Sequence, residues 1–252
     1  MAREGDGEGR KTAGASSSRK VLQILFAFSE YRGEASVAEL ASIIGAPVPT
    51  TYRHVTLLKE LQLLEDSGGG KYHPTARVMP LARAAQLTNS MARIAKPIVS
   101  TTAEQLRETV MLMQYFGDAV VCVELTECDR PMRFTFQQGH SIPLGVGASG
   151  KMALAELPAN VQASRMRELG LPDALRSEVQ VVAEQRYATS LAEVDEGLWA
   201  CSVPVFSPNE RPVVLTVAGP AARISESGRE VALDVLRKNA ALIRAKIQKY
   251  DL

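Results

Sequence analysis

A short break between two helical patterns constrains the fold of the first part of this chain more than any other feature. The break reads Gly45-Ala46-Pro47-Val48-Pro49. Neither proline can continue a helix, although Pro49 suits the first turn of a new one. Apolar residues recur at helical spacing over about 18–28, 37–44 and 49–64. Three helices in this order, with a tight turn before the third, predict a helix-turn-helix.

The ends of these helices and the segment behind them can also be read from the sequence. Ser18 can cap the first helix, which Tyr31-Arg32-Gly33-Glu34 should stop. Ser36 and Glu39 have the spacing of a capping box for the second helix. A glycine-rich tip at 68–70 lies between two short extended pieces and predicts a β-hairpin, which makes the domain a winged one. The residues expected to face inward are Val21, Leu22, Leu25, Phe26, Phe28, Val37, Leu40, Ala41, Ile44, Val55, Leu58, Leu61 and Leu64.

The rest of the chain mixes helical and extended patterns. A helix over about 75–90 is too apolar on one side to stand alone, which suggests packing against a second copy. Another helix should cover 94–108, with Pro97 in its first turn. Strands are expected at 110–115, 119–125, 132–137, 201–206 and 213–218, and helices at 149–157, 160–169, 190–196 and 225–249. This order predicts an α+β sensor-type domain around an antiparallel sheet. The expected divisions are a disordered tail over 1–15, a winged helix-turn-helix domain over 16–75, a linker helix over 76–92 and a sensor domain over 93–252.

Composition excludes several classes of protein. Lys and Arg total 29 against 28 Asp and Glu, so bulk charge does not announce a nucleic-acid binder. No run approaches 18 consecutive apolar residues, and the polar, glycine-rich start lacks the core of a signal peptide, so no membrane partner is expected. Three cysteines without a CxxC exclude a disulfide framework and fit reduced thiols in the cytoplasm.

The distribution of charge is more informative than its sum. The third helix opens with Pro49-Thr50-Thr51-Tyr52-Arg53-His54, and residues 49–59 include no acid. Hydroxyls and amides at a helix start suit phosphate contacts, and Arg53 could reach a guanine in the major groove. An ordinary capped surface helix is the alternative, but the hairpin behind it favours DNA reading. The candidate DNA-binding residues are Arg19, Ser36, Pro49, Thr50, Thr51, Tyr52, Arg53, His54 and Lys71.

The segments that resemble enzymatic motifs each lack a residue that the motif requires. The segment 145–152 nearly spells a phosphate-binding loop, but Met152 stands where a Mg²⁺-binding hydroxyl is needed. Ser149 does not lie in a nucleophile elbow, because Lys151 replaces the last glycine. No cysteine–histidine spacing predicts a metal site, and no cofactor is expected. Four aromatic residues could line a pocket, although core packing is their commoner fate: Tyr115, Phe134, Phe136 and Trp199.

From Ser18 to about Tyr250 the chain resembles the isocitrate lyase regulator (IclR) family of bacterial transcription factors. The segment 142–155, Ile-Pro-Leu-Gly-Val-Gly-Ala-Ser-Gly-Lys-Met-Ala-Leu-Ala, is similar to the family's P-L-H-A-x-A-x-G-K-A-L-L-A. Residues 196–206 and 215–220 resemble its G-x-x-C-x-A-x-P-V-F…S-V-S-G-P core. The N-terminal pieces 19–25 and 36–41 are similar to its winged helix.

The resemblance implies a GAF-like effector-binding domain joined by a linker helix to DNA-binding domains. It also implies a homodimer or a dimer of dimers, a double-stranded DNA operator and a small organic acid as effector. Ala148 and Ser149 stand where a turn presents amides to a carboxylate, Leu198 stands for an apolar wall, and Thr216 stands for a hydroxyl. The effector positions carried over in this way are Ala148, Ser149, Leu198, Ala200, Thr216 and Ala218.

Departures from the family pattern indicate the kind of effector. Ala200, not Cys201, aligns with the family's cysteine, so Cys201 should face the other side of its strand. Ala218 replaces a frequent serine, and Trp199 is expected beside the pocket. A larger and more apolar acid, such as an aromatic one, is therefore favoured as the effector over glyoxylate or pyruvate. The sequence therefore predicts a one-component transcriptional regulator and not an enzyme. The alternative is a small-molecule-binding enzyme with an accessory helical domain. The sign of regulation stays open between repression and activation.

Overall fold

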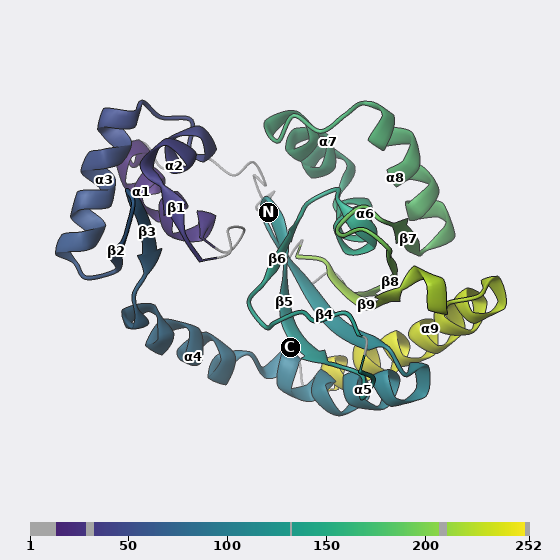
Figure 1. The fold of residues 1–252 in the computed structure, drawn as a ribbon. Helices are drawn as coiled ribbons and strands as arrows, with labels where there is room; N and C mark the ends of the chain where they lie inside the picture. The colour runs from purple at the N-terminus through teal and green to yellow at the C-terminus, as the bar shows by residue number, and fades with distance from the viewer. Residues whose placement is uncertain (1–13, 29–32, 132, 207–210, 250–252) are drawn as a thin grey trace, which may run out of the picture. The chain divides into compact units, whose positions relative to one another are not determined.

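The computed structural model describes residues 14–28, 33–131, 133–206 and 211–249, so most of the expected tail lies outside the described residues. The chain divides into two compact units, Met1–Arg83 and Ala84–Leu252. Figure 1 shows the elements of each unit along the chain. No helix in the described ranges is both long enough and apolar enough to cross a membrane.

The first unit is a winged helix-turn-helix. Its helices are α1 (Ser16–Ala27), α2 (Val37–Ile43) and α3 (Val48–Glu60), and its strands are β1 (Ala35–Ser36), β2 (Leu64–Gly68) and β3 (Lys71–Pro74). The three strands form an antiparallel sheet in the order β1-β3-β2. Buried residues from all three helices and from the hairpin make one core, which includes Ile24, Leu40, Leu58 and Leu64. The expected hairpin is therefore confirmed, and β1 is an additional strand.

Several local expectations for this unit are wrong. Ala15, not Ser18, is the N-cap of α1, and Ser18 lies inside the helix. The third helix stops at Glu60, because Gln62 takes a left-handed φ of 58° and the chain turns into β2. Three residues expected in the core are exposed instead: Leu22, Phe26 and Leu61. The expected stop of α1 at 31–34 falls partly outside the described residues.

The capping box of α2 is confirmed. The Ser36 hydroxyl accepts from the Glu39 amide at 3.3 Å, and the Glu39 carboxylate accepts from the Ser36 amide at 2.7 Å. The hydrogen bonds from the Ser36 backbone and then from its side chain lower the pKa of Glu39. Because the pKa of Glu39 is lower in the folded state than in the unfolded state, its carboxylate stabilises the fold at any pH above the ordinary carboxyl pKa. This stabilisation is lost as the pH falls through the lowered pKa.

Replacing Ser36 by alanine is expected to destabilise α2 by about 1 kcal/mol, since a helix loses an N-cap acceptor. Amide hydrogen exchange within 37–43 should become faster in this variant, and the exchange of other helices should change less. Ser42→Ala on the same helix is the matched control, because Ser42 lies on its exposed side and does not cap it. Equal protection of α2 in the Ser36 variant and the wild type would contradict this assignment.

The segment after the hairpin has a helical break that the sequence pattern did not predict. A short 3₁₀ turn (Ala76–Val78) leads into α4 (Met79–Thr88), and Asn89 then caps a separate helix, α5 (Ser90–Leu106). Pro97 lies in the middle of α5, not in its first turn as expected, because Asn89 starts the helix earlier. The ring faces solvent. Every residue from 81 to 88 is exposed, so the described residues do not cover the apolar stripe of α4, which contains Leu81, Ala82 and Ala85.

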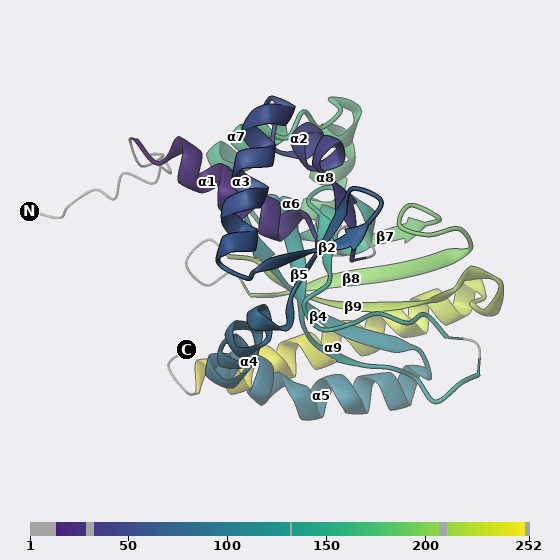
Figure 2. The ribbon, with the colours of Figure 1, turned by 60° about the vertical axis from the view of Figure 1, so that its left-hand side comes forward.

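The second unit contains a six-stranded antiparallel sheet in the order β6-β5-β4-β9-β8-β7. The strands are β4 (Thr109–Phe116), β5 (Ala119–Thr126), β6 (Ser141–Pro143), β7 (Ala188–Leu191), β8 (Leu198–Phe206) and β9 (Val213–Pro220). One face packs against α5 and α9 (Glu226–Gln248), and the other face packs against α6 (Gly147–Ala155) with α7 (Ala159–Glu168) and α8 (Ala174–Gln185) nearby (Figures 1 and 2). The sheet therefore separates two apolar cores, and the predicted α+β class is confirmed.

Two expected elements of this unit are wrong, and the strand β6 and the helix α8 were missed. No strand forms over 133–137, and Met132 lies outside the described residues; the edge strand of this side is β6 instead. The expected helix over 190–196 is the strand β7 and a turn, because Ser190 pairs with Ala200 on β8. The helix α8 was not predicted at all.

Candidate DNA-binding surface and effector site

The exposed side of α3 is formed by residues one turn apart. Pro49, Tyr52, Arg53 and Thr56 are exposed and follow each other at helical spacing of three, one and three residues. Tyr52 is 57% exposed, which is unusual for a ring without a partner surface. The Thr56 hydroxyl donates to the Tyr52 carbonyl at 3.0 Å. This face carries one cation, one aromatic ring and no acid, so it suits contact with DNA.

Two of the proposed DNA-binding side chains lie on the opposite side of α3. Thr51 is fully buried, and its hydroxyl donates to the Pro47 carbonyl at 3.2 Å. His54 is also buried, and its Nε2 has no hydrogen-bond partner within the described residues. The structure thus removes these two side chains from the surface, because α3 turns them toward the core that contains Val55 and Leu58.

The other candidates occupy different places on the first unit. Lys71 is exposed next to the tip of the hairpin, and Arg19 is half-buried on α1. Thr50 is half-buried, with its amide donating to the Pro47 carbonyl at 3.0 Å. Ser36 uses its hydroxyl in the capping box. Lys59 places its ammonium 5.2 Å from the centre of the Tyr72 ring and so fixes the end of α3 against the hairpin.

The six effector positions come together on the α6 side of the sheet. Ala148 and Ser149 are in the first turn of α6, which begins at Gly147. Ala200 and Ala218 are direct cross-strand partners on β8 and β9. All four are buried, and Leu198 packs against the same core. Thr216, on β9, is buried beside Ser149.

A chain of three buried hydroxyls joins the helix to the sheet. The Ser149 and Thr216 hydroxyl oxygens are 3.1 Å apart, and the Thr216 and Ser202 hydroxyl oxygens are 2.6 Å apart. Ser202 lies directly across from Thr216 in the β8–β9 ladder. Sequence reasoning named Ser149 and Thr216 but missed Ser202, which could have been found from its strand register two residues after Ala200.

The start of α6 leaves buried amides that could bind an anion. The Gly150 amide donates to the Val146 carbonyl, but within the described residues neither the Ala148 nor the Ser149 amide has a partner. Such amides at a helix start carry partial positive charge. Gly150 allows this turn to form, because a Cβ there would lie 2.5 Å from the Pro143 carbonyl oxygen. The glycines therefore serve close backbone packing, and the resemblance to a phosphate-binding loop ends there.

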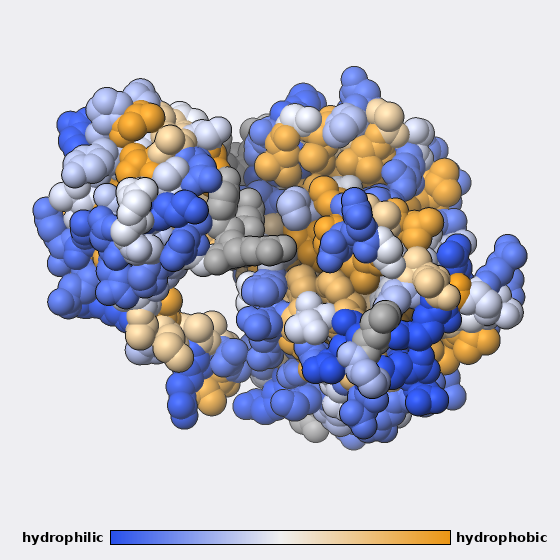
Figure 3. Space-filling view, viewed as in Figure 1, coloured by the Kyte–Doolittle hydropathy of each residue, from blue (hydrophilic) through white to orange (hydrophobic). Residues whose placement is uncertain are grey.

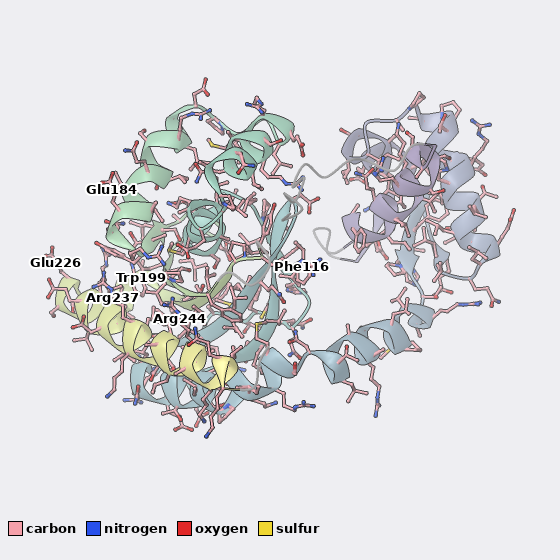
Figure 4. The ribbon with its side chains drawn as sticks, turned by 180° about the vertical axis from the view of Figure 1, so that it is seen from behind. Phe116, Glu184, Trp199, Glu226, Arg237 and Arg244 are labelled. Carbon is pink, nitrogen blue, oxygen red and sulfur yellow. The ribbon has the colours of Figure 1, made fainter. Side chains whose placement is uncertain are left out.

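The surroundings of these amides are apolar and partly aromatic. Phe134 and Phe136 stack with ring centres 5.6 Å apart and pack against the core that contains Tyr115. Trp199 and Cys201, by contrast, belong to the core on the α5 and α9 face. The expected orientation of Cys201 is confirmed. The expectation that Trp199 lies beside the pocket is wrong, because it alternates with Ala200 along β8; Figure 4 shows it beside α9. Figure 3 shows hydrophobic surface on this unit around α7 and beside β6.

Lys151 is held in an ion-pair cluster and is unavailable as a phosphate ligand. Its side chain is only 2% exposed, and its Nζ lies 2.6 Å from Glu178 Oε1 and 2.7 Å from Glu193 Oε1. Burial lowers the pKa of Lys151, but hydrogen bonds to both carboxylates outweigh it and raise that pKa overall. The second oxygen of Glu193 accepts from the Gly147 amide at 3.2 Å. Neither Glu178 nor Glu193 was singled out from the sequence.

The described residues offer little chemistry beyond binding. Burial raises the pKa of both Cys122 and Cys201 to about 12, so neither thiol is a thiolate near neutral pH. Among the residues that the structure describes, no three His, Cys, Asp or Glu side chains group closely enough to hold a metal ion. The convergent groups at the start of α6 are amides, hydroxyls and apolar side chains, which bind but do not titrate near pH 7.

Comparison with known proteins agrees with this arrangement. Residues 17–68 match the IclR helix-turn-helix domain, and residues 85–245 match the bacterial transcriptional regulator IclR C-terminal domain. The chain is 28% identical over 225 residues to the probable transcriptional regulator SauR of Cupriavidus necator, covering 84% of this chain and 88% of SauR.

Solved structures share the fold. A crystal structure of an IclR family transcriptional regulator from Brucella abortus superimposes with a TM-score of 0.80 at 18% identity, covering 97% of each chain. An IclR homologue of Microbacterium hydrocarbonoxydans, complexed with 4-hydroxybenzoate, superimposes with a TM-score of 0.64 at 18% identity, covering 92% of this chain and 99% of that one. With both of its domains matched in order, the chain belongs to the IclR family of DNA-binding bacterial transcriptional regulators.

Proposed function

We propose that this regulator binds a small carboxylic acid at the start of α6 and that the acid changes its affinity for an operator. The observation that carries the proposal is the pair of buried amides of Ala148 and Ser149, which have no hydrogen-bond partner among the described residues and lie beside the Thr216 hydroxyl. Two amides in the first turn of a helix can hold a carboxylate without a buried arginine. The relatives that it matches are named as transcriptional regulators, so the enzyme alternative is set aside.

The body of the acid should be apolar and branched or aromatic. Leu198, Ala200 and Ala218 supply apolar surface near the amides, and Phe134 and Phe136 pack into the same core. Apolar contact favours an apolar ligand by about 25 cal/mol per Å² buried. The family member complexed with 4-hydroxybenzoate supports an aromatic acid as the effector class. A two- or three-carbon oxoacid would leave this surface uncovered.

Operator reading is assigned to the exposed side of α3, with the hairpin as a second contact. In this proposal Arg53 contacts a base edge in the major groove, and Lys71 contacts a phosphate. The part of α3 that enters the groove also carries Pro49, Thr50 and Tyr52. Arg19 and Ser36 remain proposed backbone contacts. Thr51 and His54 support the helix from within. We propose that operator binding takes place in the cytoplasm, because the DNA of a bacterial cell lies there.

We also propose that α4 forms a contact between two copies, as part of a linker between a DNA-binding domain over 16–75 and a sensor domain over 93–252. Leu81 is 71% exposed, and Ala82 and Ala85, which lie on the same side of the helix, are exposed as well. Apolar side chains gathered on one side of a short helix are costly in water unless another surface covers them. A twofold pairing would cover them in both copies and set the spacing of two half-sites. A dimer of dimers is compatible with this arrangement.

Replacing Leu81 and Ala85 together by aspartate is expected to yield monomers, because two buried charges in each copy would oppose the pairing. Sedimentation velocity at low micromolar concentration measures the change, and operator affinity should fall with it. The matched control is Arg83→Asp, which makes the same exposed helix more negative by the same two charges but on the side opposite Leu81 and Ala85. An unchanged sedimentation coefficient in the Leu81 and Ala85 variant would contradict the contact.

The function itself is tested by footprinting on the promoter region of the protein's own gene. Binding should protect a defined operator, and benzoate should change the protein concentration needed for protection more than pyruvate does at equal concentration. Protection that no acid of a panel changes would refute the effector role but leave DNA binding intact. Absence of any protected sequence would refute operator binding at this promoter.

A further inference from the structure

The connection between β7 and β8, residues 192–197, lies against the start of α6. Glu193 Oε2 accepts a hydrogen bond from the Gly147 amide at 3.2 Å. Val194 approaches the same residue so closely that a Cβ on Gly147 would lie 2.7 Å from its Cγ2. A carboxylate of the chain itself therefore already occupies the first amide of the helix whose next two amides belong to the proposed effector site.

Lys151 fixes this carboxylate in place. The buried ammonium bridges Glu193 and Glu178, which come from the connection and from α8. One cation and two carboxylates give the cluster a net charge of −1. Both carboxylates are partly exposed, at 37% and 51% of their side chains, whereas the ammonium is not. The connection is thus held down by an ion pair whose acidic member can reach water without moving the lysine.

The connection is also held in an unfavourable backbone conformation. Ala192 has a φ of 57°, in the left-handed region that an alanine rarely takes. Its amide donates to the Leu198 carbonyl at 2.8 Å, which closes the hairpin. Such conformations persist only where surrounding contacts impose them. The Glu193 contacts with Gly147 and Lys151 are side-chain contacts of the next residue that add to this hydrogen bond.

We propose that the β7–β8 connection is a latch, and that the Glu193 carboxylate is an internal competitor of the effector acid. An acid on the Ala148 and Ser149 amides would bring a second negative charge beside Glu193 at the same positive helix end. Repulsion between the two then favours release of Glu193 into solvent and relaxation of Ala192. This proposal rests on the proposed function, since it assigns regulation to that same site.

Release of the latch would reach the rest of the sheet through β8. The connection leads directly into Leu198 and Ala200, which line the proposed site. Trp199, between them, pairs across the ladder with Leu191 at the last position before the connection. It is the single tryptophan of the chain and is buried. Its fluorescence therefore reports on this hairpin without any added label.

The first experiment measures benzoate binding to the full-length protein by calorimetry. Glu193→Gln keeps the size of the side chain but removes its charge, so benzoate should bind about tenfold more tightly than to wild type, the order expected for one nearby charge. Glu178→Gln is the matched control: it takes the same charge from Lys151 but does not touch the Gly147 amide, and its benzoate affinity should stay within about twofold of wild type. Glu193→Ala serves as the second variant if the glutamine variant melts below wild type.

The second experiment follows Trp199 emission of the same proteins. Saturating benzoate should shift the emission of wild type, and Glu193→Gln should show that shift before any acid is added; Glu178→Gln should resemble wild type. Equal benzoate affinity in Glu193→Gln and wild type, or weaker binding in the variant, overturns the latch but leaves the effector site standing. Binding to neither protein overturns the proposed effector class and the latch together. Binding to Glu193→Gln alone supports both.

Discussion

Replacing Arg53 by alanine is expected to weaken operator binding by about 1–3 kcal/mol, or roughly 5- to 150-fold, and to relax the preference for one base pair. The guanidinium lies on the exposed side of α3, and its neighbours along that side are Pro49, Tyr52 and Thr56. A bidentate contact with guanine has no substitute there, because none of these neighbours is a cation. Fluorescence anisotropy with the footprinted operator and with single-base variants of it measures both effects.

Lys71→Ala is the control for this experiment. Lys71 is exposed beside the hairpin tip, where a lysine meets phosphate or the minor groove rather than a major-groove base edge. Its loss should weaken all DNA sequences alike and reduce the dependence of affinity on salt by about one counterion. If Arg53→Ala bound the operator as tightly as wild type does, α3 would not be the recognition helix. If both variants lost affinity equally on every sequence, Arg53 would contact only the backbone.

Local signals in the sequence predicted the first unit well. The capping box of Ser36 and Glu39 and the hairpin after α3 depend on neighbouring residues, and both are present. The inward side of α3 was predicted correctly at Val55 and Leu58, which are buried. Thr51 and His54 were nevertheless assigned to the DNA-binding surface, although each lies four residues before one of these two and therefore faces the same side.

The second unit shows where local signals fail. Residues 190–196 have a helical composition, yet Ser190 pairs with Ala200, because the long strand β8 offers an open edge there. Trp199 and Ala200 are neighbours on β8, so their side chains lie on opposite faces of the sheet. The expectation that Trp199 lies beside the effector site overlooked this alternation.

The ion-pair cluster lies beyond any reading of local sequence. Lys151 finds its carboxylates 27 and 42 residues away, on elements whose approach depends on the whole sheet. The Gly-Lys motif drew attention to Lys151, but its ion-pair partners could not be predicted, because many Asp and Glu residues of the chain were possible partners. The proposed effector positions were assigned together by the family resemblance, and the fold brings Ser149 and Thr216 within hydrogen-bonding distance.

Replacing Ala200 by phenylalanine is expected to abolish benzoate binding while leaving operator binding without acid intact. Ala200 lies across from Ala218 in the ladder, and both pack in the same core as Ala148 at the start of α6. A phenyl ring grown from this position would fill the space that the body of the acid needs. Overpacking of this kind costs about 1–3 kcal/mol of stability, so the melting temperature must be measured beside the affinity.

Ala200→Ser is the matched control, because it adds a single hydroxyl at nearly constant volume and keeps the space open. Calorimetry across a panel of acids should find benzoate binding to wild type and Ala200→Ser but not to Ala200→Phe. The serine should also narrow the gap between benzoate and pyruvate, since a hydroxyl on this wall can donate to an oxoacid. A folded Ala200→Phe protein that binds benzoate as wild type does would place the acid elsewhere. Tighter binding of glyoxylate or pyruvate than of benzoate to wild type would mean that the amides and hydroxyls, and not the apolar surface of β8 and β9, decide which acid this regulator detects.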